Sequence, residues 1–207
     1  MPRIKEITLY QFDELDDAAK NRAMDWYREG GPDHAWWGSC YEQAATAGAI
    51  LGIDLHTKGR KAGPTIYFSG FSSQGDGACF EGTWRYAKGW RKALRAEFGG
   101  DLLKSLEPIG QALQDAAKRQ LYQVSAVCNH RGSYYHSGCM AVEVTHDDST
   151  WRDIGDTEGE VRDALRQFAD WIYGSLESEH DWLQADEQVA DSIRANEYEF
   201  NKDGSRA

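Results

Sequence analysis

The residues YFSGFSSQGDGACFEG, at positions 67–82, decide the fold of this chain. Two aromatic-rich segments in this stretch meet around Gly75, Asp76 and Gly77. Glycine readily adopts the positive φ angles of a tight turn, and aromatic residues favour β-strands. We therefore predict a first hairpin, formed by strands over residues 65–71 and 78–84.

A second hairpin is predicted from strand-like segments at 121–130 and 134–144, joined by a loop at 131–133. This register pairs Val124 with Met140 and keeps the apolar side chains on one face of the sheet. A further strand is predicted over residues 4–10, where apolar and polar residues alternate.

Apolar residues recur at helical spacing outside the hairpins, which predicts several helices. In the C-terminal part the spacing is carried by Val161, Leu165, Phe168, Ile172 and Leu176. The sequence thus predicts an α+β fold with an antiparallel sheet of about four or five strands. We expect its helices to pack mainly on one face, with acidic helices at the C-terminus.

Length and charge predict one domain over residues 1–207 with an uneven charge distribution. The formal net charge is −11. Residues 1–146 hold 17 Asp and Glu against 17 Lys and Arg, whereas residues 147–207 hold 17 against 6. We expect a charge-balanced α+β core over 1–146 and an acidic helical part over 147–207. Such a field attracts a basic partner and disfavours direct contact with nucleic acid.

Hydropathy and cysteine content predict in which cellular compartment the protein resides. The first residues lack the apolar region of a signal peptide, and no apolar run is long enough to span a membrane. Four cysteines in 207 residues do not resemble a disulfide framework. We expect a cytoplasmic protein with reduced, mostly buried thiols.

Four residues of the second hairpin could be zinc ligands: Cys128, His130, His136 and Cys139. Side chains three residues apart on a regular strand point to opposite faces. The predicted register therefore groups Cys128, His130 and His136 and leaves Cys139 apart, unless a bulge at 137–138 reorients it. We expect no structural zinc and no other cofactor, although three ligands and a water remain an alternative.

Polar and aromatic residues at the ends of the two hairpins could bind a small ligand. Histidine, arginine and tyrosine suit an anionic molecule or a protein loop. The alternative is that they only pack the turns, and an Asp between two glycines commonly stabilises its own turn. The candidate ligand-binding residues are Gln74, Asp76, His130, Arg131, Tyr134, Tyr135 and His136. We predict no catalytic residue, because no base lies in pattern with a nucleophile.

A second set of residues could bind a protein partner. Exposed aromatics often anchor interfaces, and carboxylates complement a basic surface. The candidate partner-binding residues are Trp36, Trp37, Glu177, Glu179, Asp181, Asp186 and Glu187. The alternative is burial of the tryptophans in the core and a merely solvated acidic helix. A homodimer would also bury part of this aromatic surface, and no residue pattern decides between monomer and dimer.

Distinctive motifs occur at FDELDDAAK (12–20) with Trp26 and Tyr27, YFSGFSSQGDGACFEG (67–82), HRGSYYHSGC (130–139) and ANEYEF (195–200). With these motifs the chain resembles a largely uncharacterised family of bacteriophage and prophage proteins, some of which carry an antitoxin-like label. The resemblance covers almost the whole chain and brings no established catalytic residues. It implies an accessory gene of a mobile element, whose product binds and blocks a factor in the host cytoplasm.

Charge and resemblance together favour a non-enzymatic accessory protein that inhibits a host defence or nucleic-acid-associated protein through an acidic surface. Anti-CRISPR, anti-restriction and antitoxin activities, including mimicry of DNA, are variants of this function. The first alternative is a protein that sequesters an anionic nucleotide signal. The second alternative, a metal-dependent hydrolase, has the least support in the sequence.

Overall fold

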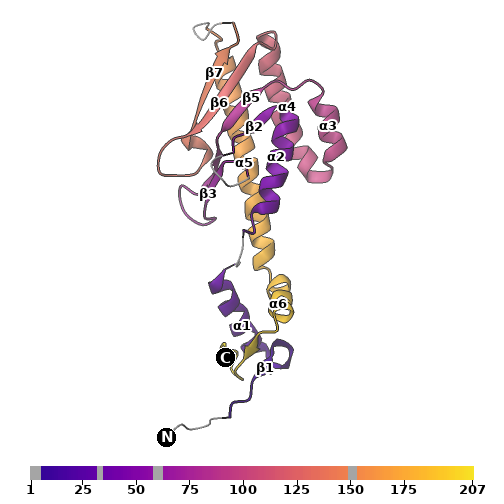
Figure 1. Ribbon diagram of the computed structural model, residues 1–207, viewed down its shortest axis with the longest axis vertical. Helices are drawn as coiled ribbons and strands as arrows, with labels where there is room; N and C mark the ends of the chain where they lie inside the picture. The colour runs from indigo at the N-terminus through magenta and orange to yellow at the C-terminus, as the bar shows by residue number, and fades with distance from the viewer. Residues whose placement is uncertain (1–5, 32–34, 58–62, 149–152) are drawn as a thin grey trace. The chain divides into compact units, whose positions relative to one another are not determined.

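A computed structural model describes residues 6–31, 35–57, 63–148 and 153–207 of the chain. The chain forms two compact units (Figure 1). Unit 1 combines Met1–Trp36 with Ser178–Ala207, and unit 2 is Trp37–Glu177. The sequence predicted one domain with a change of charge at residue 146, whereas the unit boundaries fall elsewhere, after Trp36 and after Glu177.

The main sheet of unit 2 is antiparallel, with strand order β2-β5-β6-β7. Its strands are β2 (Ile53–Leu55), β5 (Gly82–Arg85), β6 (Val124–His130) and β7 (Met140–His146). Burial alternates along β6, where Val124, Ala126 and Cys128 are buried and Val127 is exposed. One face of the sheet is therefore covered by the helices of unit 2, as the sequence predicted (Figure 1).

The first hairpin forms a separate two-stranded sheet. Strands β3 (Ile66–Ser69) and β4 (Gly77–Phe80) pair in antiparallel fashion across the predicted turn. The strand predicted over residues 78–84 is divided into two, because the chain leaves β4 at Phe80 and enters the main sheet as β5. A Cβ atom on Gly82 would lie 2.3 Å from the Asp54 carbonyl oxygen, so only glycine allows β5 to approach β2 this closely.

The predicted register of the second hairpin is wrong. Val124 pairs with His146 rather than with Met140, which instead faces His130. The predicted pairing assumed that residues 134–139 belong to the strand. This segment leaves the ladder and ends in the 3-10 helix η2 (Ser137–Cys139), where the Cys139 N–H donates to the His136 carbonyl at 2.9 Å.

Helices supply most of the core of unit 2. They are α2 (Gly38–Leu51), α3 (Trp90–Glu97), α4 (Gly100–Arg119) and α5 (Thr157–Gln184), the last of which belongs to unit 2 up to Glu177. The predicted spacing in α5 is confirmed, since Val161, Leu165, Phe168, Ile172 and Leu176 are all buried. The Phe168 ring meets the Phe80 ring edge to face, with centroids 5.6 Å apart.

Unit 1 joins the two ends of the chain. Its elements are β1 (Tyr10–Gln11), the 3-10 helix η1 (Phe12–Glu14), α1 (Asp17–Gly30), α6 (Asp186–Ala195) and β8 (Glu199–Phe200). Strands β1 and β8 pair in antiparallel fashion. Part of the predicted strand at 4–10 lies outside the described residues, and the described part becomes a strand only at Tyr10.

Apolar residues from both chain ends form the core of unit 1. The buried cluster consists of Phe12, Leu15, Ala19, Ala23, Met24, Val189, Ala190, Ile193 and Phe200. Asp16 begins α1, because its carboxylate accepts the Ala19 N–H at 2.9 Å and satisfies a free helix-terminal donor. Among the described residues no helix is both long and apolar enough to cross a membrane.

Replacing Phe168 tests the core of unit 2. Phe168→Ala should lower the free energy of unfolding by about 3–5 kcal/mol, because it leaves a cavity beside Phe80. Chemical denaturation followed by circular dichroism measures this change. Asp170→Ala, on the exposed side of the same helix, should change stability by less than about 0.5 kcal/mol. Equal losses for the two variants would contradict the packing described for α5.

Candidate functional site

The two sequence motifs predicted to bind a ligand meet at one hollow in unit 2. Gln74, Gly75 and Asp76 line it from the loop before β4, and Tyr134 and His136 line it from the loop before η2. The volume of the hollow is about 590 Å³, which suits a small molecule or a peptide side chain. The structure therefore brings together four of the seven predicted ligand-binding residues.

Asp76 stabilises the loop on its side of the hollow. One of its carboxylate oxygens accepts the Ser73 N–H at 2.6 Å and the Ser72 N–H at 3.0 Å. Hydrogen bonds from the backbone of Ser73, from that of Ser72 and from the Ser69 side chain lower the Asp76 pKa. Asp76 therefore stays ionised at neutral pH and stabilises its own turn, which is the alternative role given for it from the sequence.

Two glycines, which have no Cβ atom, allow the loop before β4 and the loop before η2 to approach each other. A Cβ atom on Gly77 would lie 2.6 Å from the His136 Cβ and 2.7 Å from its Cα. A Cβ atom on Gly75 would lie 3.2 Å from the Tyr134 ring, and Gly75 also has a positive φ of 94°. The absence of a side chain at Gly75 and Gly77 therefore lets Tyr134 and His136 lie close against the first hairpin.

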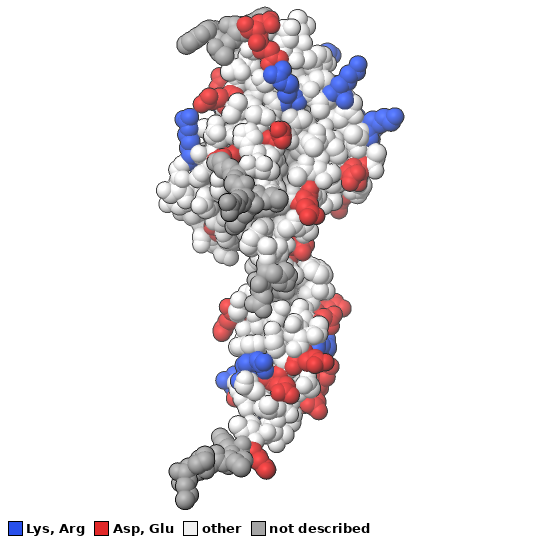
Figure 2. Space-filling model, in the orientation of Figure 1, with Lys and Arg blue, Asp and Glu red and all other residues white. Residues whose placement is uncertain are grey.

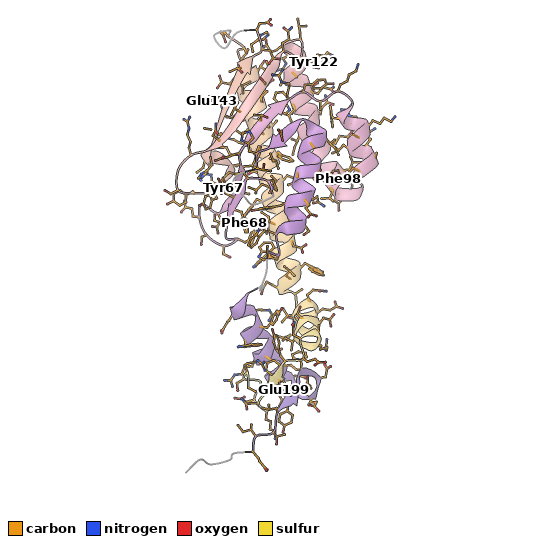
Figure 3. All side chains as sticks on the ribbon, in the orientation of Figure 1. Tyr67, Phe68, Phe98, Tyr122, Glu143 and Glu199 are labelled. Carbon is orange, nitrogen blue, oxygen red and sulfur yellow. The ribbon has the colours of Figure 1, made fainter. Side chains whose placement is uncertain are left out.

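Tyr67, His130 and Tyr135 pack together and anchor the same loop. Tyr67 lies on β3 and is labelled in Figure 3. Its ring stacks on that of Tyr135, with ring centroids 5.6 Å apart. The His130 ring lies 5.3 Å from Tyr67 and 5.2 Å from Tyr135, and its Nε2 is 3.0 Å from the Tyr134 carbonyl oxygen. His130 and Tyr135 thus position the loop, and the hollow itself is lined by other residues.

Arg131, the cation of the predicted ligand site, contacts a carboxylate of the main sheet. Its Nη2 lies 3.3 Å from a carboxylate oxygen of Glu143 on β7, and both side chains are largely exposed. The described lining of the hollow contains one carboxylate, Asp76, and no Lys or Arg. Its electrostatics therefore suit a neutral or cationic polar group better than an anion.

The four candidate zinc ligands are arranged differently from the prediction. Cys139 Sγ lies 3.4 Å from His136 Nε2, so the residue expected to stand apart is the one beside His136. The reason is the 3-10 turn at 137–139, which turns Cys139 back toward His136. Cys128 is buried on β6, and burial raises its pKa to about 12. No group of three or more His, Cys, Asp or Glu side chains suited to a metal occurs among the described residues.

Both tryptophans predicted as exposed partner anchors are half-buried. The Trp36 ring lies 5.8 Å from the His180 ring in unit 1, and the Trp37 ring lies 5.9 Å from the Phe68 ring in unit 2. Trp182 is the tryptophan with a largely exposed side chain among the described residues, at 53%. Sequence reasoning missed it, although its position between Asp181 of α5 and Asp186 of α6 was a usable signal.

The predicted acidic partner-binding residues lie in both units. Glu177 belongs to unit 2, whereas Glu179, Asp181, Asp186 and Glu187 belong to unit 1. Asp181, Asp186 and Glu187 are exposed, and Asp186 also forms an ion pair with Arg28. Acidic side chains predominate beside α6 on the face drawn in Figure 2.

Charge is divided unevenly between the two units. Unit 1 holds 16 Asp and Glu against 8 Lys and Arg in 66 residues. Unit 2 holds 18 against 15 in 141 residues. Most of the net negative charge thus belongs to unit 1, which contains residues from both ends of the chain and not only from the C-terminal part.

Residues 36–186 match the family model described as a domain of unknown function, DUF8835. The chain belongs to the DUF8835 family. The match covers all of unit 2 and only a small part of unit 1, so α1 and most of α6 lie outside it. No curated protein and no solved structure gives a significant match to the chain.

Protonation of the Asp76 carboxylate in this DUF8835 protein should release the loop that the carboxylate orders. Because hydrogen bonds from the Ser73 and Ser72 backbone favour the ionised form, the pKa of Asp76 in the folded protein lies below its ordinary value. The hydrogen bonds are lost as the pH falls through that lowered pKa. The amide proton resonances of Ser72 and Ser73 should report this transition in an NMR titration. Asp76→Ala should abolish it, and a midpoint at or above the ordinary pKa of an aspartic acid would contradict the assigned role.

Cys139 should be the most reactive cysteine of this DUF8835 protein. Cys40, Cys79 and Cys128 are buried, and burial raises the pKa of Cys79 to about 12, as it does for Cys128. Iodoacetamide at pH 7.5 should therefore modify Cys139 first, as measured by peptide mass spectrometry.

His136→Asn should slow the modification of Cys139 by about threefold or more, because it removes the imidazole Nε2 that lies 3.4 Å from the Cys139 Sγ. Tyr134→Phe, which keeps His136, is the matched control and should leave the rate unchanged. Modification of a buried cysteine before Cys139 would contradict the packing described here.

Proposed function

We propose that this protein is a non-enzymatic accessory protein of a bacteriophage or prophage. It inhibits a host defence or nucleic-acid-associated protein by presenting the acidic surface of unit 1 to a basic region of that protein. The phage origin rests on the motif resemblance described above. The observation that carries the binding mode is the concentration of uncompensated carboxylates in unit 1.

Ion pairs within unit 1 leave much of this charge available to a partner. Arg22 pairs with Asp203, Arg28 with Asp25 and Asp186, and Arg194 with Asp13 and Asp191. With 16 acidic and 8 basic residues, one-to-one pairing cannot neutralise the unit. Such exposed pairs are also weak, so the surface keeps a directed negative field.

A negative field of this kind favours a basic protein and repels nucleic acid. Phosphate recognition needs Lys and Arg, which are outnumbered two to one in unit 1. A carboxylate array can instead occupy a surface on which the target normally binds phosphates. Anti-CRISPR, anti-restriction and antitoxin activity would all follow from such competition, and they differ only in the identity of the target.

The hollow in unit 2 supports a second function, the binding of a small polar ligand. Gln74, Asp76, Tyr134 and His136 supply an amide, a carboxylate, an aromatic ring and an imidazole around about 590 Å³. An anionic nucleotide is the ligand expected from the sequence, but the Asp76 carboxylate and the Arg131–Glu143 contact favour a neutral or cationic molecule. Sequestering such a molecule would also require no catalysis.

Capture of the target from host lysate tests the proposed function. Tagged protein is incubated with nuclease-treated lysate at low salt, and bound proteins are quantified by mass spectrometry. Asp181→Lys with Glu187→Lys reverses two exposed charges of unit 1. The double variant should capture at least about tenfold less of a basic partner than the unmodified protein does, because like charges now meet at the interface.

The matched control reverses two exposed charges of unit 2, through Glu97→Lys with Asp115→Lys. Both double variants change the net charge by the same amount, so non-specific electrostatic capture should fall equally in both. The proposal requires a loss confined to the unit 1 variant. Equal losses, no loss, or no captured basic protein would contradict it.

A further inference from the structure

A second hollow, in unit 1, is walled by aromatic side chains and carries a carboxylate. It encloses about 290 Å³ and is lined by Trp26, Tyr27, Glu29, Gly30, Gly31 and Tyr198. The lining comes from α1, its C-terminal cap and the residue before β8. All three rings are half-buried, and Glu29 is exposed.

The three rings are inclined to each other, as the walls of a cage are. Trp26 and Tyr198 meet edge to face at an interplanar angle of 89°, with centroids 5.4 Å apart. Tyr27 lies 6.5 Å from Trp26 at 66° and 6.3 Å from Tyr198 at 49°. Inclined aromatic faces around a small volume favour a cation, because each face is the negative side of a ring quadrupole.

Two of these three rings, those of Tyr198 and Trp26, already contact a guanidinium of the chain itself. The Arg206 Cζ lies 4.9 Å from the Tyr198 ring centroid and 5.6 Å from the Trp26 ring centroid. Both distances fall within the range of a cation–π interaction. Packing against the core of unit 1 fixes the ring positions, since Trp26 also meets the buried Phe200 at 5.7 Å.

We propose that the aromatic hollow of unit 1 binds the side chain of an arginine on a basic protein partner. The rings hold the planar guanidinium by cation–π contact, and the Glu29 carboxylate at the rim accepts its N–H groups. The choice of a protein partner rests on the proposed function. The hollow would act as the specific anchor within the less specific acidic surface.

Peptide titration tests this site without the partner. The probe is Ac-Gly-Arg-Gly-NH2, and the isosteric control is the same peptide with citrulline, which keeps the shape of arginine but lacks its charge. The Trp26 indole N–H resonance, assigned with Trp26→Phe, should shift with a dissociation constant of the order of millimolar for one anchored side chain. The citrulline peptide should bind at least about threefold more weakly, because it loses the cation–π term.

Glu29→Gln should weaken binding of the arginine peptide by about threefold or more, because it removes the rim charge. Asp25→Asn is the matched control, since Asp25 is exposed one turn earlier on α1 and does not line the hollow. Equal binding of the two peptides, an equal effect of the two variants, or no shift at Trp26 would overturn the proposal. Lysate capture tests the proposed function separately. Peptide binding without a captured partner would contradict the proposed function and leave the arginine site supported.

Discussion

The burial of apolar side chains from the two chain ends is the interaction on which unit 1 depends. Phe12, Leu15 and Met24 near the N-terminus meet Ile193 and Phe200 near the C-terminus in one buried cluster. This contact brings together two acidic segments that are separated by unit 2 in the sequence. Like charges within such a unit repel each other, and hydrophobic burial offsets that cost. The directed negative field and the aromatic hollow both follow from this association.

In unit 2 the corresponding constraint is the close approach of two loops. Gly77 leaves room for the His136 backbone, and Asp76 orders its own loop through the Ser72 and Ser73 amides. The Tyr67 stack then holds Tyr135 and the loop that carries His136. Residues with fixed roles in packing therefore shape the hollow and supply its polar groups. The two distinctive sequence motifs of the chain thus contribute to one structural feature of the DUF8835 domain.

Elements with local signals were predictable, and features that depend on distant contacts were not. The helical spacing around Phe168 predicted α5, and the glycines beside Asp76 predicted the first turn. The register of β6 and β7 could not be predicted, because nothing local shows that residues 134–139 leave the ladder. The candidate ligand residues were found as a group because both motifs are turn-like and polar. The aromatic hollow was missed because Trp26 and Tyr198 come together only when the chain ends associate.

We propose unit 1 as the partner-binding part of the molecule. The most direct test is carbodiimide cross-linking of the captured complex, which joins partner lysines to nearby carboxylates as amides and is followed by peptide mass spectrometry. We predict cross-links to carboxylates within residues 6–31 and 178–207, above all at Asp181 and Glu187. Cross-links confined to unit 2 carboxylates, such as Asp76 and Glu143, would contradict the claim and assign partner binding to the hollow between the two motifs.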